Sequence, residues 1–180
     1  MSGLVACVAS RGYASVTIND IVRAAHVSKS TFYAQFSGKE ECFLATYEFA
    51  AATVLNVIVD AADSDLPYED RVMAATMAYM ERAAQDPDTT RTFILEVLAA
   101  GPDALEMRHE VNRRFASLLI ELVDQATDPG IRPLSEAAAL LVVGGANELV
   151  LAAIVEDRLD ELPDQAPVVA RALLSEVTGQ

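Results

Sequence analysis

The 180-residue sequence has little of what enzymes, metal proteins and membrane proteins depend on. Its two cysteines and two histidines lack ligand spacing, so we expect neither a metal nor a cofactor. It has no glycine-rich phosphate loop, no H-E-x-x-H pair and no nucleophile elbow, so no catalytic residue is predicted. No apolar run reaches about 18 residues, and no charged-then-apolar leader is present. We therefore expect a cytoplasmic protein that is not an enzyme and has no membrane partner.

The remaining reactive or charged side chains have simple explanations. Cys7 and Cys42 stand alone in apolar settings, which predicts buried, reduced thiols. The acidic residues from Asp60 to Asp70 lack the spacing and glycine of an EF-hand, which favours a solvated linker. The basic residues from Arg108 to Arg114 indicate an exposed helix stripe, although an anionic ligand site is the alternative.

Residues 17–43 contain the pattern of two short helices and the start of a third. Thr17 and Asp20 form a predicted capping box at the first helix. Ser28 is a good N-cap for the second helix, whose two phenylalanines lie four residues apart and face inward together. The polar side chains of this second helix then face outward, and they are Lys29, Ser30, Thr31, Tyr33 and Gln35.

None of these outward residues is acidic, and all can donate hydrogen bonds to phosphates or base edges. A helix that lies in the major groove of double-stranded DNA needs such a face. Ser37 and Glu40 form a second predicted capping box, which places Lys39 beside the free backbone amides of a following helix. That position suits a phosphate, so the pattern predicts a DNA-binding helix-turn-helix.

This stretch resembles the N-terminal domain of the TetR family of transcriptional regulators. The matching elements are R-G-Y at 11–13, T-I-N-D-I at 17–21, A-x-V-S-K-S-T-F-Y at 25–33 and F-S-G-K-E at 36–40. The resemblance implies that Thr17, Tyr33 and Lys39 meet phosphates. It places four residues toward the bases, namely Lys29, Ser30, Thr31 and Gln35. It also implies a DNA-binding domain at 1–47 and a helical ligand-binding and dimerisation domain at 48–180.

The beginning of the chain departs from the family pattern. Family members usually start with an arginine-rich arm and a longer first helix, whereas Met1 stands only a dozen residues before Tyr13. Either the true start lies upstream or the arm is lacking, and its loss would remove contacts that add affinity through counterion release. The shortened helix is still expected to pack through residues 4–9 and to end at Gly12 as its C′ residue.

The charge of the chain is divided unevenly. Residues 1–47 have four basic and three acidic side chains, a net charge of +1. Because the whole chain has a net charge of −14, residues 48–180 carry −15. Such a partition orients a protein on DNA with its acidic part turned away, and it weakens non-specific binding. The acidic total is therefore compatible with a DNA-binding head.

Beyond Tyr47 the pattern is helical between prolines, so the predicted fold is all-α, with a three-helix helix-turn-helix domain followed by a helical domain. Expected helices cover residues 40–60, 68–85, a shorter one that starts at 86–88, and 103–124. Breaks are expected at 63–67, at 101–102 and at 128–130. Ser135 caps a further helix, and a last one follows Pro163.

The helix after Ser135 is apolar nearly all round and must be covered on more than one side. Gly144 and Gly145 inside it cost about 1 kcal/mol each relative to alanine, which indicates close approach of another backbone. Two such helices per chain predict a homodimer through a four-helix bundle, and monomer core is the alternative. The predicted interface residues are Leu141, Gly144, Gly145, Glu148, Leu149, Val169 and Leu173.

An apolar effector pocket is predicted among the middle helices. Thioethers and aromatic rings adapt to irregular apolar guests, although such residues are equally typical of ordinary core. The predicted ligand-binding residues are Met73, Met77, Met80, Phe93, Met107 and Phe115. Filling the pocket is expected to spread two DNA-binding heads and release the operator.

The sequence thus predicts a dimeric, ligand-responsive repressor of a near-palindromic operator. The alternative is a helical small-molecule-binding protein whose shortened head no longer binds DNA. An all-α enzyme is a third class, and it lacks candidate chemistry.

Overall fold

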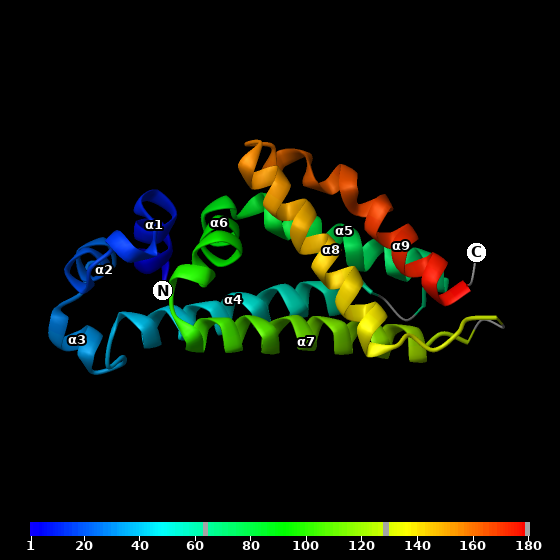
Figure 1. Ribbon diagram of the computed structural model, residues 1–180, viewed down its shortest axis with the longest axis horizontal. Helices are drawn as coiled ribbons and strands as arrows, with labels where there is room; N and C mark the ends of the chain where they lie inside the picture. Colours follow the sequence, from blue (N-terminus) through cyan, green and yellow to red (C-terminus); the bar gives the residue numbers. More distant parts are fainter. Residues whose placement is uncertain (63–64, 128–129, 179–180) are drawn as a thin grey trace. The chain divides into compact units, whose positions relative to one another are not determined.

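The computed structural model describes residues 1–62, 65–127 and 130–178, and within them the chain forms helices and no strand. The predicted all-α class is therefore confirmed. The helices, coloured along the chain in Figure 1, are α1 Ser2–Arg11, η1 Tyr13–Ser15, α2 Ile18–Ala24, α3 Lys29–Tyr33, α4 Lys39–Ala61, α5 Tyr68–Gln85, α6 Pro87–Leu95, η2 Glu96–Ala99, α7 Pro102–Asp124, α8 Glu136–Val155, η3 Leu159–Gln165 and α9 Ala166–Thr178.

Two compact units divide the chain, and both are built from two segments. We call Met1–Ala52 with Asp86–His109 the head, and Thr53–Gln85 with Glu110–Gln180 the body. This division differs from the predicted boundary at residue 47, because α6 packs on α1 and its Phe93 contacts aromatic rings of α4. The segment 86–109 therefore packs with the predicted DNA-binding helices.

The core of the head is a small aromatic cluster. Phe43 is fully buried, and its ring meets those of Tyr13 and Phe93 edge-on at centroid distances of 5.1 and 5.3 Å. Tyr47 stacks on Phe93 at 4.8 Å. Edge-on and stacked pairs stabilise beyond the area that they bury, so these four rings fix α6 against α4 and η1.

Helix α1 crosses α2 at very short range. A Cβ atom built at Gly3 would lie 2.7 Å from the backbone nitrogen of Ala25, so only glycine fits there. The helix ends at Gly12, whose φ of 77° is a left-handed value that glycine adopts without strain. The short first helix with a terminal glycine is thus present as expected.

The core of the body lies between α5, α7, α8 and α9. Tyr68 and Val72 of α5, Ala116 and Val123 of α7, and further residues of α8 and α9 form one buried cluster. Helix α5 begins at Tyr68 and ends at Gln85 as predicted, and Ser135 caps α8 by accepting from the amide of Ala138 at 3.2 Å. The predicted breaks at 63–67 and 128–130 lie partly outside the described residues.

Helices α4 and α8 are long and apolar enough to cross a membrane by length and composition. This differs from the expectation that no segment reaches that length. Core helices meet the same criterion, and both helices carry buried residues, Phe43 in α4 and Ala139 in α8 among them. Composition therefore does not by itself place either helix in a bilayer.

We predict that Gly3→Ala destabilises the protein by about 1–3 kcal/mol, because the new methyl group overpacks against the backbone of Ala25. Thermal unfolding should show a decrease in Tm of several degrees. Gly38→Ala is the matched control, since no atom lies within 4 Å of a Cβ at that position. Equal melting temperatures for Gly3→Ala and the wild type would contradict the close crossing.

Candidate nucleic-acid interface and ligand cavity

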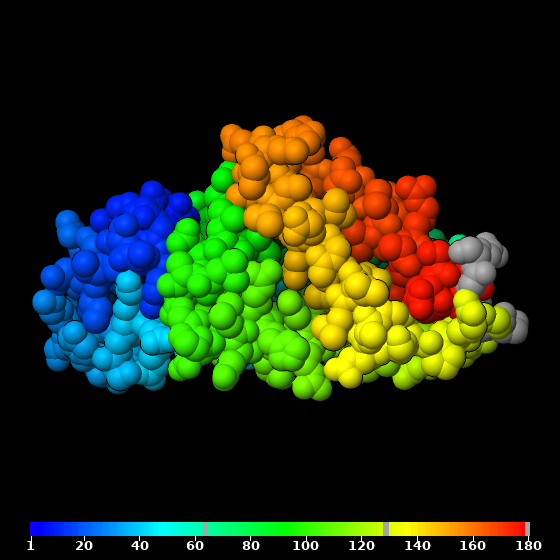
Figure 2. Space-filling view, viewed as in Figure 1, coloured from blue at the N-terminus to red at the C-terminus, as the bar shows by residue number. Residues whose placement is uncertain are grey.

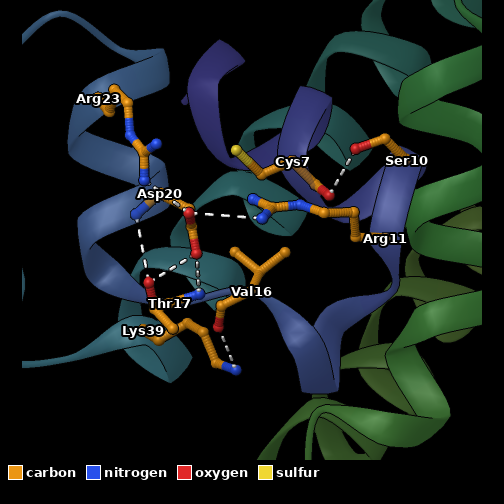
Figure 3. A network of polar contacts seen from close by, with 8 residues as sticks. All are labelled: Cys7, Ser10, Arg11, Val16, Thr17, Asp20, Arg23 and Lys39. Carbon is orange, nitrogen blue, oxygen red and sulfur yellow. Dashed lines mark hydrogen bonds and ion pairs between the residues drawn. The ribbon is translucent and has the colours of Figure 1, made fainter.

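Helix α2 begins with the predicted capping box (Figure 3). The amide of Asp20 donates to Thr17 Oγ1 at 3.3 Å, and the amide of Thr17 donates to Asp20 Oδ2 at 3.0 Å. The Thr17 hydroxyl also donates to the same carboxylate at 2.6 Å. The predicted phosphate contact of Thr17 would therefore have to compete with Asp20 for this hydroxyl.

Asp20 is the electrostatic centre of this end of the head. Its carboxylate lies 3.0 Å from the guanidinium of Arg23 and 3.4 Å from that of Arg11. Hydrogen bonds from the side chain and backbone of Thr17, followed by the charge of Arg11, lower the pKa of Asp20 to about 2. The cap is therefore fully charged at neutral pH.

The turn between α2 and α3 uses a left-handed residue. His26 has a φ of 54°, an uncommon value for a residue with a side chain, and its amide donates to the carbonyl of Arg23 at 3.2 Å. Ser28 then accepts from the amide of Thr31 at 3.0 Å, which confirms the predicted cap of α3. The turn and cap together fix the direction in which α3 leaves α2.

Helix α3 buries one side and exposes the other. Phe32 is buried and packs on the half-buried Phe36 at a ring distance of 5.5 Å. The five polar residues predicted to face outward are exposed, and so is the cap residue Ser28, which is also a predicted DNA-binding residue; the five are Lys29, Ser30, Thr31, Tyr33 and Gln35. These six exposed residues lie on α3, at its N-cap and just beyond its end, and we call them the α3 face.

The ammonium group of Lys39 binds the backbone of its own chain. Its Nζ atom donates to the carbonyl of Tyr13 at 2.9 Å and to that of Val16 at 3.0 Å, and it lies 4.0 Å from the centroid of the Tyr13 ring. Burial lowers the pKa of Lys39. Because an ammonium group has three donors, one remains for the predicted phosphate contact.

The predicted capping box of Ser37 and Glu40 is wrong, because Ser37 pairs with Glu41. The amide and hydroxyl of Ser37 donate to Glu41 Oε2 at 2.7 and 2.5 Å, one residue further along α4. The carboxylate of Glu40 lies instead beside Gly101, whose built Cβ would be 3.0 Å from Glu40 Oε1. The shift arises because α4 begins at Lys39, so Glu41 faces back toward Ser37.

Glu96 holds the backbone of the head and was missed by the sequence analysis. Its Oε2 atom accepts from the amide of Tyr13 at 2.7 Å. Tyr13 is thus bound on both sides, by Glu96 at its N–H and by Lys39 at its carbonyl. No local pattern signals this contact, because it joins residues 83 positions apart.

The body contains an apolar cavity of about 60 Å³. Its walls come from α4, α5, α7, α8 and α9, and the lining residues are Ile58, Val72, Ala75, Thr76, Tyr79, Phe115, Leu118, Leu119, Leu122, Val142, Val143, Ala146, Asn147, Val169 and Leu173. Of the six predicted ligand-binding residues, Phe115 lines the cavity. The lining consists mainly of valine, leucine and alanine, whereas the sequence analysis predicted methionine and phenylalanine side chains.

The other five predicted ligand residues lie elsewhere. Phe93 and Met107 belong to the head, where Phe93 is part of the aromatic cluster. Met80 is fully buried, Met73 packs against the body core, and Met77 is half-buried. The structure therefore does not bring these six residues together at one site.

Helices α8 and α9 enclose a second hollow, a groove of about 300 Å³ at the surface of the body. Four predicted interface residues line it, namely Leu141, Gly145, Leu149 and Val169. Leu173 lines the cavity instead, whereas Gly144 and Glu148 are exposed. In Figure 2 the surface of α8, coloured yellow and orange, faces the viewer.

The described residues offer little other chemistry. Among them, no group of three or more His, Cys, Asp or Glu side chains is placed to hold a metal ion. Cys7 and Cys42 are buried and form no disulfide, as expected of lone apolar thiols.

Two short capped helices joined by a tight turn form a helix-turn-helix in the head. Residues 2–46 match the family model described as bacterial regulatory proteins, tetR family. The first quarter of the chain is therefore similar to the DNA-binding domain of TetR-family transcriptional regulators. No curated protein sequence matches the chain.

Solved structures share the fold over nearly the whole chain. The fatty acid degradation regulator FadR from Bacillus halodurans has a TM-score of 0.86 at 20% identity, covering 98% of this chain and 96% of that one. FadR from Bacillus subtilis in complex with stearoyl-CoA has a TM-score of 0.81 at 15% identity, with the same coverage. A tetR-family regulatory protein from Rhodococcus RHA1 has a TM-score of 0.73 at 20% identity, covering 96% and 93%.

We predict that the Thr17–Asp20 cap makes stability depend on pH in acid. Because the folded pKa of Asp20 is about 2, below its ordinary 3.8, the stabilisation is present above pH 4 and is lost as pH falls toward 2. Asp20→Asn should therefore melt below the wild type at pH 5–7, and the difference should shrink between pH 4 and 2. Glu81→Gln, which changes an exposed carboxylate of α5, is the control. A difference that is constant with pH would contradict the assignment.

Proposed function

We propose that the protein is a dimeric repressor that binds a near-palindromic operator with α3 in the major groove and leaves it when an apolar ligand fills the body cavity. The observation that carries the proposal is the α3 face, six exposed polar residues without a carboxylate on a capped helix and beside its two ends. Hydroxyl, amide and ammonium groups there can donate to base edges and phosphates. The uneven charge of the chain supports the same orientation on DNA.

Contacts on the α3 face divide into two kinds under this proposal. Lys29, Ser30, Thr31 and Gln35 lie toward the bases, and Tyr33, with 54% of its surface exposed, meets a phosphate. Thr17 and Lys39 approach the backbone from the flanking helices, and Lys39 does so with the one donor that Tyr13 and Val16 leave free.

The apolar lining of the body cavity supports an apolar effector. The cavity lies within the body, and α4 and α7 each run from the body into the head. A ligand that moves these helices in the body therefore displaces residues of the head on the same helices. FadR from Bacillus subtilis was solved in complex with stearoyl-CoA, and this supports the proposal of a ligand with an apolar chain. Coupling of this kind is typically about 1–3 kcal/mol, or 5- to 150-fold in DNA affinity.

The surface groove of α8 and α9 supports the homodimer. Leu141 is 78% exposed, and no atom of the described chain lies within 4 Å of a Cβ built at Gly144 or Gly145. Glycines inside a helix that approach nothing in their own chain are explained by close approach of a second copy. Pairing would place two α3 faces about one duplex turn apart on a palindromic site.

We predict that base-facing and phosphate-facing variants separate in DNA-binding measurements. Lys29→Ala should cost about 1–3 kcal/mol on duplexes selected by the wild type and relax the preference at one position. Tyr33→Ala should weaken binding to selected and random duplexes alike. Arg171→Ala, which removes an equal charge from exposed α9, should change neither.

The salt dependence tests Lys39 separately. If its ammonium group reaches a phosphate, Lys39→Ala should reduce the slope of log affinity against log salt by about 0.9. An unchanged slope with a lower Tm would assign Lys39 to holding Tyr13 and Val16 alone. A wild-type protein that binds every duplex equally weakly would favour the alternative, a ligand-binding protein with an impaired head.

We predict that the wild type sediments as a dimer and that Leu141→Glu yields monomers, because a charge would be buried in the paired groove. Leu98→Glu introduces the same charge at a leucine that is 63% exposed in the head, and it should leave the dimer intact.

The effect of Gly144→Ala on stability should differ in sign between a monomer and a dimer. The substitution should stabilise a monomer by about 0.5–1 kcal/mol through helix propensity, but weaken a dimer with closely packed backbones. A monomeric wild type at micromolar concentration would contradict the interface.

A further inference from the structure

The lining of the body cavity is apolar except at one end. Three of its fifteen residues are polar, and they are Thr76 and Tyr79 of α5 and Asn147 of α8. Thr76 donates its hydroxyl to the carbonyl of Val72 at 2.8 Å, within its own helix, so this donor is already used. The polar character that a ligand meets therefore comes from Tyr79 and Asn147.

A chain of two hydrogen bonds crosses three helices at this end. The Tyr79 hydroxyl donates to Asn147 Oδ1 at 2.9 Å, and Asn147 Nδ2 donates to Asn112 Oδ1 of α7 at 3.2 Å. In this arrangement the Tyr79 hydroxyl supplies the proton of the first bond, and the Asn147 amide supplies that of the second. The amide of Asn147 is thereby held at the wall of the cavity.

Asn147 keeps hydrogen-bonding capacity on its cavity side. A carboxamide has two N–H donors and can accept two hydrogen bonds, and the contacts to Tyr79 and Asn112 use one of each. One N–H and one lone pair of Asn147 therefore remain for another partner. An asparagine amide at the wall of an apolar cavity is costly to bury unless these groups are satisfied.

The charge of the cavity decides which partner fits. None of the fifteen described lining residues is charged, so a carboxylate in the cavity would lose its water without gaining a cation. A neutral oxygen loses less hydration and can accept from the remaining N–H. The lining thus selects against an anionic head inside the cavity.

We propose that Asn147 is the residue that recognises the ligand, and that the ligand is an apolar molecule carrying a neutral oxygen, as a hydroxyl or a carbonyl, which hydrogen-bonds to the Asn147 amide. The inference rests on the proposed function, because it concerns the same cavity. A volume of about 60 Å³ is far below the roughly 300–1,000 Å³ of typical ligand sites, so binding must enlarge the cavity. Since Asn147 is bonded to α5 and α7, a ligand bound to it acts on three helices at once.

The test measures dissociation constants of the 180-residue protein for probes that share an eight-carbon chain, namely octane, 1-octanol, methyl octanoate and octanoate, by calorimetry without DNA. The quantity compared is the ratio of the octane constant to that of each oxygen-bearing probe. In Asn147→Leu this ratio should fall at least about fivefold for octanol, methyl octanoate or both, the effect of one hydrogen bond. Thr76→Val removes a hydroxyl from the same wall and should leave the ratios unchanged, because that hydroxyl is used within α5.

A second variant guards against misfolding. Asn147→Leu leaves the Tyr79 hydroxyl without its acceptor, whereas Tyr79→Phe combined with Asn147→Leu removes that donor as well, and it should lose selectivity equally. The proposal is overturned if the ratios survive in both variants, if octanoate is the preferred probe at pH 8, or if neither neutral probe binds. If the ratio of dissociation constants falls for octanol alone, the group that Asn147 recognises is a hydroxyl. If the ratio falls for methyl octanoate alone, the group is a carbonyl.

Binding to operator DNA is measured in a separate titration with octanol. Octanol that binds through Asn147 without lowering DNA affinity would leave this assignment intact and remove the ligand-gated function. Conversely, DNA release that persists with unchanged selectivity in Asn147→Leu would keep the function and refute the role of Asn147.

Discussion

Helices α2 and α3 have seven and five residues, lengths at which an isolated helix in water is not stable. The α3 face therefore depends on side chains that satisfy the free amides of each first turn and on contacts that other helices make with α2 and α3. Thr17 and Ser28 supply the caps, each worth about 1 kcal/mol. Gly3 allows α1 to cover α2 at backbone distance, and Phe32 fastens α3 to the head.

The backbone around Tyr13 carries that support into the rest of the head. Glu96 of η2 binds its amide, and Lys39 at the start of α4 binds its carbonyl. Both side chains carry charges, and hydrogen bonds to charged groups contribute about 1.5–3 kcal/mol when formed. The segment that joins α6 to α7 is thereby tied to the turn before α2. A movement of α6 or η2 within the head thus reaches the start of α2 through one hydrogen bond.

Local signals in the sequence predicted the helices well. The caps at Thr17, Ser28 and Ser135 and the bounds of α5 depend on neighbouring residues, and the structure confirms them. Features that depend on distant residues were not predictable in this way. Lys39 lies inward because the carbonyls of Tyr13 and Val16 come within its reach only after folding. The family resemblance supplied an outward role for Lys39 and carried no information on this contact.

The cavity shows the same limit, because it forms where faces of several helices fail to fill the space between them. Methionines were expected there, yet Met80 is fully buried and the walls are branched aliphatic residues. The single asparagine of the mainly apolar helix α8, Asn147, was the available signal, since a half-buried amide requires hydrogen-bond partners, which here come from other helices.

A small cavity has an energetic consequence for a regulator. At about 24 cal/mol per Å³, an empty volume of 60 Å³ costs about 1.4 kcal/mol of stability. A ligand that fills it recovers this free energy, and enlarging the cavity takes some of it back. The recovered amount lies within the 1–3 kcal/mol range of typical allosteric coupling. The free-energy cost of the empty cavity is therefore similar to the free energy that a ligand needs to shift the equilibrium between two arrangements of the body helices. The shift occurs when the second arrangement binds the ligand more tightly than the first.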